Sequence, residues 1–216
     1  MQRIIIFVNG ELPDIGKARA ILQNDDFIIC ADGGTRHALA LDLKPDLVIG
    51  DMDSTEKEDL QELQNEGVAI ELFPRDKDET DLELAVARAV EKSPRQILIV
   101  AALGGRLDQT LANIALLSDP RFATLDLRLD DGVEEILFCR EQAEVRGGGG
   151  DIVSLIPWGA PVHHVRTQGL KWALNNETLA PERTRGISNE MLSDIASVKI
   201  GSGLLLIVHR RISRKD

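Results

Sequence analysis

Short apolar runs alternate with segments of helical spacing from the start of the chain to about Leu129. The runs with the length and apolar character of strands are Ile4–Val8, Phe27–Ala31, Leu47–Ile49, Val68–Phe73, Ile97–Leu103 and Leu125–Leu129. Repeated strand–helix alternation with uninterrupted apolar strands is typical of a parallel sheet buried on both faces. The pattern therefore predicts an α/β unit, a Rossmann-like parallel sheet flanked by helices, with right-handed crossovers.

Two helix starts are marked in this part of the chain. Thr80 and Glu83 have the spacing of a capping box, which predicts a helix whose first turn contains Asp81. A second helix is expected to begin near Asp108. Its residues expected to face the core are Leu111, Ile114, Ala115 and Leu117.

The pattern changes after Val133–Cys139, where strand-like runs separated by Gly, Pro and Asn replace the alternation. These runs are Ile152–Ile156, Val162–Thr167, Leu170–Leu174, Ile195–Ile200 and Leu204–His209. They predict a small antiparallel β-sandwich or partial barrel, so we expect an α/β domain over residues 1–140 and a β domain over residues 141–216. The glycines at 147–150 could form a flexible linker or a tight turn.

Composition and charge exclude some classes of protein. With 43% hydrophobic residues the chain can form an ordinary globular core. Its formal net charge of −11 argues against a nucleic-acid-binding protein, because such proteins neutralise phosphates with Lys and Arg. An acidic surplus suits metal ions or cationic ligands, although solubility alone also explains it.

Cys30 and Cys139 each lie in an apolar run, which is typical of buried reduced thiols and of a cytoplasmic protein. The N-terminus lacks the apolar run of a signal peptide, and no segment approaches the ~18 apolar residues of a membrane span. We therefore expect no export and no membrane anchor. The basic residues Arg210, Arg211, Arg214 and Lys215 are expected to form a solvated end.

Acidic and glycine residues follow several of the predicted strands. Because ligands of open parallel sheets bind at the carboxyl ends of the strands, these loops are expected to form one rim. The loops are Asp32-Gly33-Gly34-Thr35, Gly50-Asp51-Met52-Asp53-Ser54, the segment with Asp76, Asp78 and Asp81, and Gly104-Gly105-Arg106-Leu107-Asp108.

Such a rim of carboxylates predicts a Mg²⁺ site, because Mg²⁺ prefers oxygen ligands and clustered acids repel each other without a cation. The absence of Cys or His clusters beside these acids disfavours zinc. The pairs Gly33-Gly34 and Gly104-Gly105 allow backbone N–H groups to approach a phosphate, and Arg106 could contact one. The Gly-x₄-Gly-Lys-Ser/Thr and Gly-x-Gly-x-x-Gly patterns are absent, which disfavours P-loop kinases and dehydrogenases.

Together these motifs resemble the thiamine pyrophosphokinase family. The segments that carry the resemblance are Ala31-Asp32-Gly33-Gly34, Pro45 to Ser54, Lys77-Asp78-Glu79-Thr80-Asp81, Leu103 to Asp108, Gly169-Leu170-Lys171-Trp172, Ile187-Ser188-Asn189-Glu190 and Gly203-Leu204-Leu205. They occur in the family's order and span nearly the whole chain.

The resemblance implies an α/β nucleotide-binding domain, a C-terminal β-sandwich and a homodimer with active sites between its subunits. It also implies transfer of a pyrophosphoryl group from ATP to the hydroxyl of thiamine, which gives thiamine diphosphate and AMP. Mg²⁺ held by Asp51, Asp53 and Asp81 would bridge the phosphates. Asp78 and Asp108 would complete or orient the metal shell, and Asp108 is a candidate proton acceptor.

The same resemblance assigns the remaining candidate residues to ligands. Asp32, Gly33, Gly34, Thr35, Gly104, Gly105 and Asp78 are expected to contact the nucleotide, and Trp172, Ser188 and Asn189 to contact thiamine. An aromatic face suits the cationic thiazolium ring, although Trp172 could equally be a core residue, and Ser188 and Asn189 could equally belong to a turn.

One position departs from the family. The family segment usually continues Ala-Asn after Asp-Gly-Gly, whereas this chain has Thr35-Arg36. A long cation replaces a small amide there, which leaves the role of position 36 open between a lost hydrogen bond and a gained phosphate contact. Arg36 is therefore not counted among the expected site residues.

Two alternatives remain from the sequence. Asp51-Met52-Asp53-Ser54-Thr55 also resembles the nucleophile loop of haloacid-dehalogenase phosphatases, in which Asp51 would attack phosphate and Asp130-Asp131 would supply the late acidic pair. That reading leaves the Lys77–Asp81 and Gly104–Asp108 loops without a role. A nucleotide- or thiamine-binding sensor without turnover would use the same residues as the enzyme.

Overall fold

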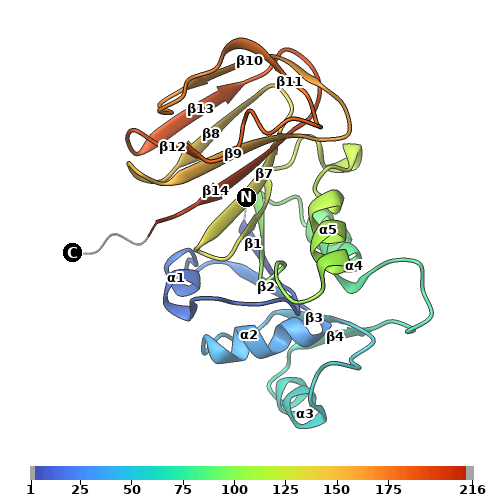
Figure 1. Cartoon of the computed structure of the whole chain (residues 1–216). Helices are drawn as coiled ribbons and strands as arrows, with labels where there is room; N and C mark the ends of the chain where they lie inside the picture. Colours follow the sequence, from blue (N-terminus) through green and yellow to red (C-terminus); the bar gives the residue numbers. More distant parts are fainter. Residues whose placement is uncertain (1–2, 213–216) are drawn as a thin grey trace. The chain divides into compact units, whose positions relative to one another are not determined.

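The computed structural model of the chain describes residues 3–212 and divides into two compact units between Gly132 and Val133 (Figure 1). The boundary expected from sequence, at residues 140–141, falls one strand later. Residues 213–216, which include Arg214 and Lys215 of the expected solvated end, lie outside the described residues.

The first unit is a parallel sheet with helices between its strands. Its strand order is β6-β5-β1-β2-β3-β4, and every neighbouring pair is parallel. The strands are β1 Arg3–Phe7, β2 Phe27–Ala31, β3 Leu47–Gly50, β4 Ala69–Leu72, β5 Gln96–Val100 and β6 Leu127–Asp130. The helices are α1 Ile15–Ala20, α2 Thr35–Ala40, α3 Lys57–Asn65, α4 Asp81–Glu91 and α5 Leu107–Leu116, with 3₁₀ turns at Asp32–Gly34 and Pro120–Phe122.

Both faces of this sheet are buried, which explains why its central strands are apolar throughout. Ile4, Ile5 and Ile6 of β1 point to alternating faces and are all fully buried. One face packs against α2 and α3 through Ala38 and Leu63. Burying one such side chain contributes about 1.5–3 kcal/mol, so the central strands account for much of the unit's stability. The predicted parallel α/β architecture is confirmed.

The two marked helix starts are also found. Thr80 Oγ1 accepts a hydrogen bond from the Glu83 N–H at 3.2 Å, and α4 begins at Asp81. Helix α5 begins at Leu107, one residue before the predicted position. In the part of the chain that the structure describes, no helix has both the length and the apolar character needed to cross a bilayer.

The predicted inward face of α5 was only partly right. Leu117 is buried, but Leu111 is 51% exposed and Ala115 is exposed as well. The buried residue is Asn113, whose Nδ2 donates to the Ala102 carbonyl at 2.8 Å. Helical spacing predicts which residues share one side of a helix. Here the buried side of α5 contains the polar residue Asn113, because the loop after β5 offers it a carbonyl partner.

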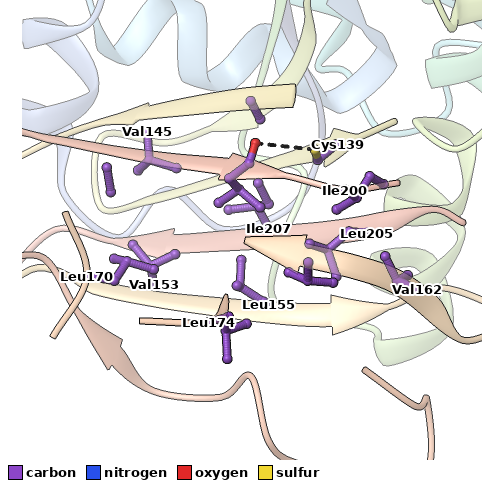
Figure 2. Close-up of a cluster of buried hydrophobic side chains, with 14 of the residues drawn as sticks. Cys139, Val145, Val153, Leu155, Val162, Leu170, Leu174, Ile200, Leu205 and Ile207 are labelled. Carbon is purple, nitrogen blue, oxygen red and sulfur yellow. Dashed lines mark hydrogen bonds between the residues drawn. The ribbon is translucent and has the colours of Figure 1, made fainter. Parts of the chain in front are cut away.

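The second unit consists of antiparallel strands in two sheets, ordered β12-β9-β14-β7 and β11-β10-β13-β8. The strands are β7 Glu134–Cys139, β8 Gln142–Arg146, β9 Ile152–Pro157, β10 Val162–Gln168, β11 Asn175–Leu179, β12 Asn189–Glu190, β13 Ile195–Lys199 and β14 Leu205–Arg210. Their core contains Val145, Leu155, Val162 and Ile207, and Cys139 Sγ donates to the Val198 carbonyl within it (Figure 2). The predicted antiparallel β unit is confirmed.

Leu170–Leu174 was wrongly predicted to be a strand. Leu170 and Leu174 are buried, but only an isolated bridge from Leu170 to Met191 forms there. Their apolar character comes from packing as a loop against the core, and the strand follows as β11 Asn175–Leu179, whose exposed positions are polar.

The glycines at 147–150 form a fixed turn between β8 and β9 and not a flexible linker. The Gly148 N–H donates to Asp151 Oδ2 at 2.9 Å, and the Gly150 N–H donates to the Met191 carbonyl at 2.8 Å. Gly150 has φ +92°, a conformation that glycine adopts without strain.

Candidate functional site

A cleft of about 670 Å³ opens where the parallel strands of the first unit end. It is lined by the segments that follow β1, β2, β3, β4 and β5, and this volume is in the range of small-molecule sites. Because all these strands point the same way, their carboxyl ends meet at one edge, as expected for open parallel sheets. The structure therefore brings the four sequence-predicted loops together and adds the loop after β1.

Three carboxylates in this cleft form a group that could hold a metal ion. One oxygen from each of Asp32, Asp51 and Asp53 lies within 4.8 Å of the others. Asp32 is only 5% exposed, and its Oδ1 accepts a hydrogen bond from Thr55 Oγ1 at 3.1 Å. Acids this close repel each other strongly unless a cation or a proton offsets their charge.

A fourth carboxylate, Asp81, approaches this group across Gly50. A Cβ at Gly50 would lie 3.0 Å from Asp32 Cβ and 3.1 Å from Asp81 Cγ, and the residue has φ +148°. Only glycine fits this position without displacing one of the two acids. Gly50 thus allows Asp32 and Asp81 to approach each other at the end of β3.

The Asp81 carboxylate has an unusual environment. Burial raises its pKa, Lys77 opposes this effect, and the negative charges of Asp32 and Asp51 reinforce it. Lys77 Nζ lies 3.0 Å from Asp81 Oδ1, yet the contact does not have hydrogen-bond geometry, so this buried oxygen has no hydrogen-bond donor among the described residues.

These observations fit a hard divalent cation. The donor atoms are carboxylate oxygens, and no His or Cys belongs to the group within the described residues. Oxygen-only ligands suit Mg²⁺ or Ca²⁺ better than zinc. Asp81 Oδ1 faces the Lys77 ammonium but accepts no hydrogen bond among the described residues, so it could serve as a ligand of such a cation. Asp32, expected from sequence to contact the nucleotide, belongs to this group by position.

The loops at this edge contain strained backbone. Asp32, Met52 and Ala101 have φ values of 42°, 60° and 56°, a region that side-chain-bearing residues rarely adopt. Such strain gathers at ligand sites, where the surrounding structure compensates for it.

The predicted glycines divide into two groups. Gly104 and Gly105 line the cleft, and the Gly105 N–H donates to Glu11 Oε1 at 3.1 Å. Gly33 and Gly34 do not line it: a Cβ at Gly33 would lie 2.5 Å from Asn9 Cγ, and one at Gly34 would overlap the Phe7 carbonyl. These two glycines allow close packing against β1.

Thr35 and Asp78 also lie outside the described cleft lining. Thr35 is fully buried and its Oγ1 donates to the Asp32 carbonyl at 2.8 Å, which fixes the turn that carries Asp32. Asp78 is exposed.

Arg106 lines the cleft with its guanidinium paired to Asp108, at 3.1 Å from Nε to Oδ1 and 2.5 Å from Nη2 to Oδ2. This pairing lowers the pKa of the Asp108 carboxyl. The Asp108 side chain is 65% exposed and is not part of the cleft lining. A carboxylate of low pKa is a weak proton acceptor, so its geometry suits holding Arg106 better than acting as a base.

Several lining residues were missed from sequence: Asn9, Gly10, Glu11, Arg36, Gln109 and Asn113. The first three follow the apolar run of β1, so the rule applied to the other strands would have found them. Gln109 and Asn113 are polar residues one turn apart on α5, a strip that was overlooked in favour of the leucines.

The sequence-predicted thiamine residues belong to the second unit. Trp172 is 48% exposed, so it is not a core residue, and Lys171 Nζ lies 4.7 Å from its ring centroid. Asn189 is buried and holds the Trp172 backbone: its Oδ1 accepts from the Trp172 N–H at 3.0 Å, and its Nδ2 donates to the Trp172 carbonyl at 2.8 Å. The Ser188 N–H donates to Ser154 Oγ, and Ser188 has φ 59°.

Comparison with known proteins identifies similar chains for both units. Residues 18–129 match the family described as thiamin pyrophosphokinase, catalytic domain, and residues 139–205 match its vitamin B1 binding domain. The chain is 30% identical over 182 residues to thiamine pyrophosphokinase of Bacillus subtilis, which covers 83% of this chain and 85% of that protein. It is 30% identical to thiamine pyrophosphokinase 1 of Arabidopsis thaliana over 93% of this chain and 84% of the relative.

Solved structures agree with these matches. The crystal structure of thiamine pyrophosphokinase from Bacillus subtilis superposes with a TM-score of 0.88 at 26% identity, over 98% of this chain and all of that one. The structure of thiamin pyrophosphokinase from Geobacillus thermodenitrificans gives a TM-score of 0.83 at 26% identity, over 98% and 99% of the two chains.

Proposed function

The chain belongs to the thiamin pyrophosphokinase family and is an enzyme of that family, and we propose that it transfers the pyrophosphoryl group of Mg-ATP to the thiamine hydroxyl. The products are thiamine diphosphate and AMP. The observation that carries this proposal is the group formed by Asp32, Asp51, Asp53 and Asp81 in a cleft of nucleotide size.

Asp51, Asp53 and Asp81 are the residues that would hold Mg²⁺, with Asp32 beside them. A bound Mg²⁺ would neutralise phosphate charge and orient the triphosphate. Two observations support this assignment: the group offers only oxygen ligands, and Asp81 Oδ1 accepts no hydrogen bond from the described residues. The short Asp51-x-Asp53 spacing supports it too, because the Asp53 N–H donates to Asp51 Oδ1 at 3.1 Å and so fixes the Asp51 carboxylate against the backbone of Asp53.

Other residues of the cleft bind and orient the nucleotide. Gly104 and Gly105, at φ 80° and 65°, line the cleft, and a phosphate oxygen would replace Glu11 Oε1 as the acceptor of the Gly105 N–H. Arg106 offers a guanidinium held by Asp108, and a fixed cation of this kind stabilises charge that develops on a phosphoryl group. In-line attack of the thiamine hydroxyl oxygen on the β-phosphorus would break the bond from that phosphorus to the bridging oxygen, so that AMP leaves and the hydroxyl proton passes to water.

Thiamine is proposed to contact Trp172 through its cationic ring system. The exposed indole supports this role, because an aromatic face attracts a permanent cation. Asn189 fixes the Trp172 backbone and so acts as a positioning residue for the indole.

A homodimer in the cytoplasm is part of the same proposal. Exposed apolar side chains on the second unit, among them Trp172, Leu192 and Ile195, support an interface with a second copy. The buried free thiols of Cys30 and Cys139 support a reducing compartment.

The phosphatase alternative loses its support. Asp51 follows the third strand of the sheet, Asp130 and Asp131 are outside the described cleft lining, and the matched family is a different one. Product analysis tests the proposal directly: Mg-ATP and thiamine should yield AMP and thiamine diphosphate in equal amounts. ADP with thiamine monophosphate, or inorganic phosphate alone, would contradict it.

A further inference from the structure

Four cationic side chains line the cleft within the described residues, and three of them pair with an aspartate. The pairs are Arg75–Asp53 at 3.4 Å, Lys77–Asp81 at 3.0 Å and Arg106–Asp108 at 2.5 Å. The positive charge of each pair is already offset in part by its partner. The fourth cation, Arg36, differs from them.

Arg36 is held by uncharged groups. Its Nη2 donates to the Gly10 carbonyl at 2.9 Å and to the Asn9 carbonyl at 3.4 Å, and its Nε lies 3.3 Å from His37 Nε2. No carboxylate of the described residues pairs with it. Backbone carbonyls orient a guanidinium without neutralising it, and within residues 3–212 Nη1 donates no hydrogen bond.

The neighbouring imidazole does not add a second charge. Burial lowers the pKa of His37, and this effect is larger than the rise caused by the contact with the Gly10 carbonyl. The charge of Arg36 lowers the same pKa further. His37 is therefore neutral at neutral pH. Arg36 carries the positive charge of this corner of the cleft, on the side formed by the loop after β1 and the start of α2.

We propose that Arg36 binds a phosphate group of the nucleotide and supplies affinity for the polyphosphate chain. A guanidinium that keeps N–H donors on one nitrogen can donate a charge-assisted hydrogen bond to a phosphate oxygen. The rest of the cleft is rich in carboxylates, so a polyanionic ligand needs a cation that is not already paired. The backbone anchors fix Arg36 in advance, which reduces the entropy lost on binding.

This inference rests on the proposed function for the identity of the nucleotide, but its test does not need turnover. Binding of inorganic tripolyphosphate and of adenosine is measured by calorimetry on the full chain, for the wild type and for Arg36→Gln. Loss of one charge-assisted hydrogen bond weakens binding by roughly 10- to 100-fold. We expect that increase in Kd for tripolyphosphate, an adenosine Kd within about twofold of wild type, and partial recovery in Arg36→Lys.

The matched control is Arg19→Gln, because Arg19 also donates to a backbone carbonyl, that of Leu41, but lies outside the cleft. It should bind both probes as the wild type does. An unchanged tripolyphosphate Kd in Arg36→Gln would overturn the proposal. An increase in the adenosine Kd as large as that for tripolyphosphate would also overturn it, because it would indicate a disturbed loop.

Steady-state kinetics separate this inference from the proposed function. Arg36→Gln should raise the KM for ATP and leave the KM for thiamine unchanged. A wild-type chain without thiamine turnover would contradict the function and leave the tripolyphosphate comparison valid. A higher KM for thiamine and not for ATP would overturn the role of Arg36.

Discussion

Lys77 Nζ lies 3.0 Å from Asp81 Oδ1, four residues before it in sequence, and both side chains are only partly exposed. Asp81 lies at the first position of α4, beside Asp32 and Asp51. Among the described residues, the ammonium of Lys77 forms the ion pair that offsets this carboxylate. The pair therefore connects the acidic group to the segment that follows β4.

The Lys77–Asp81 pair makes metal binding depend on pH. Burial raises the pKa of Asp81, so a proton competes with a metal as the pH falls through that pKa, and Mg²⁺ affinity should decrease there. Lys77 opposes this rise, so Lys77→Met should raise the pKa further and move the midpoint of the Mg²⁺ affinity profile to higher pH. Titrations with Mg²⁺ across pH measure the midpoint, and a shift to lower pH would contradict the pairing.

Asp51→Asn and Asp53→Asn should each reduce kcat/KM by at least ~100-fold, because each removes a charge on the metal side of the cleft. The melting temperature should stay close to that of the wild type, since neither side chain contributes to the apolar core. Asp42→Asn is the control, because the Asp42 side chain is 92% exposed and pairs only with Arg19 among described residues. Near-normal turnover in either cleft variant would refute the metal assignment.

Gly50→Ala should separate Asp32 from Asp81 and weaken Mg²⁺ binding, because the added methyl group would contact both side chains. Gly67→Ala is a matched control: its φ is +82°, and a Cβ there would meet nothing within 4 Å. Both variants lose stability from backbone strain, by more than roughly 1 kcal/mol. Only Gly50→Ala should lose Mg²⁺ affinity in a calorimetric titration. Equal affinities in the two variants would exclude the spacing role of Gly50.

The second unit contains a buried hydrogen-bonded cluster around Asp151 whose contribution to stability should depend on pH. His209 is fully buried, with Nδ1 3.2 Å from Glu135 Oε2 and Nε2 3.1 Å from Asp151 Oδ2. Burial alone would raise the pKa of Asp151, but hydrogen bonds from the Ile212 N–H, His209 and the Gly148 N–H together lower it.

A carboxyl whose pKa is lower in the folded state stabilises that state above its unfolded pKa, about 3.9, and this stabilisation disappears as the pH falls through the folded value. Asp151→Asn should therefore cost about 3 kcal/mol at pH 7 and progressively less in acid. Trp158 and Trp172 both belong to the second unit, so fluorescence during urea unfolding reports this cluster. A difference between variant and wild type that is constant from pH 7 to pH 3 would contradict this account.

The sequence correctly predicted the elements whose pattern has a single physical cause, either burial of apolar side chains or capping of a helix. The fully buried strands, such as β1, follow from their uninterrupted apolar residues, and α4 follows from its Thr80 cap. The Leu170–Leu174 error and the Leu111 error have a common cause, because an apolar run records burial or spacing and not the partner against which it packs.

The sequence predicted which loops meet at the edge of the sheet, but not the side-chain contacts that form there. Polar residues after parallel strands gave Asp51, Asp53 and Asp81, because strand direction brings these positions to one edge. The pairing of Asp108 with Arg106 and the unpaired charge of Arg36 depend on side-chain directions that spacing does not determine. The packing role of Gly33 and Gly34 depends on how closely β1 approaches them.

The fate of the three phosphates of ATP tests the central claim most directly. Thiamine and Mg²⁺ are incubated with ATP that carries ³²P in the α, β or γ position, and the thiamine product and the nucleotide product are separated and counted. Pyrophosphoryl transfer predicts that β and γ label both enter thiamine diphosphate in equal amounts while α label remains in AMP. Transfer of γ label alone, or release of label as inorganic phosphate, would contradict the account.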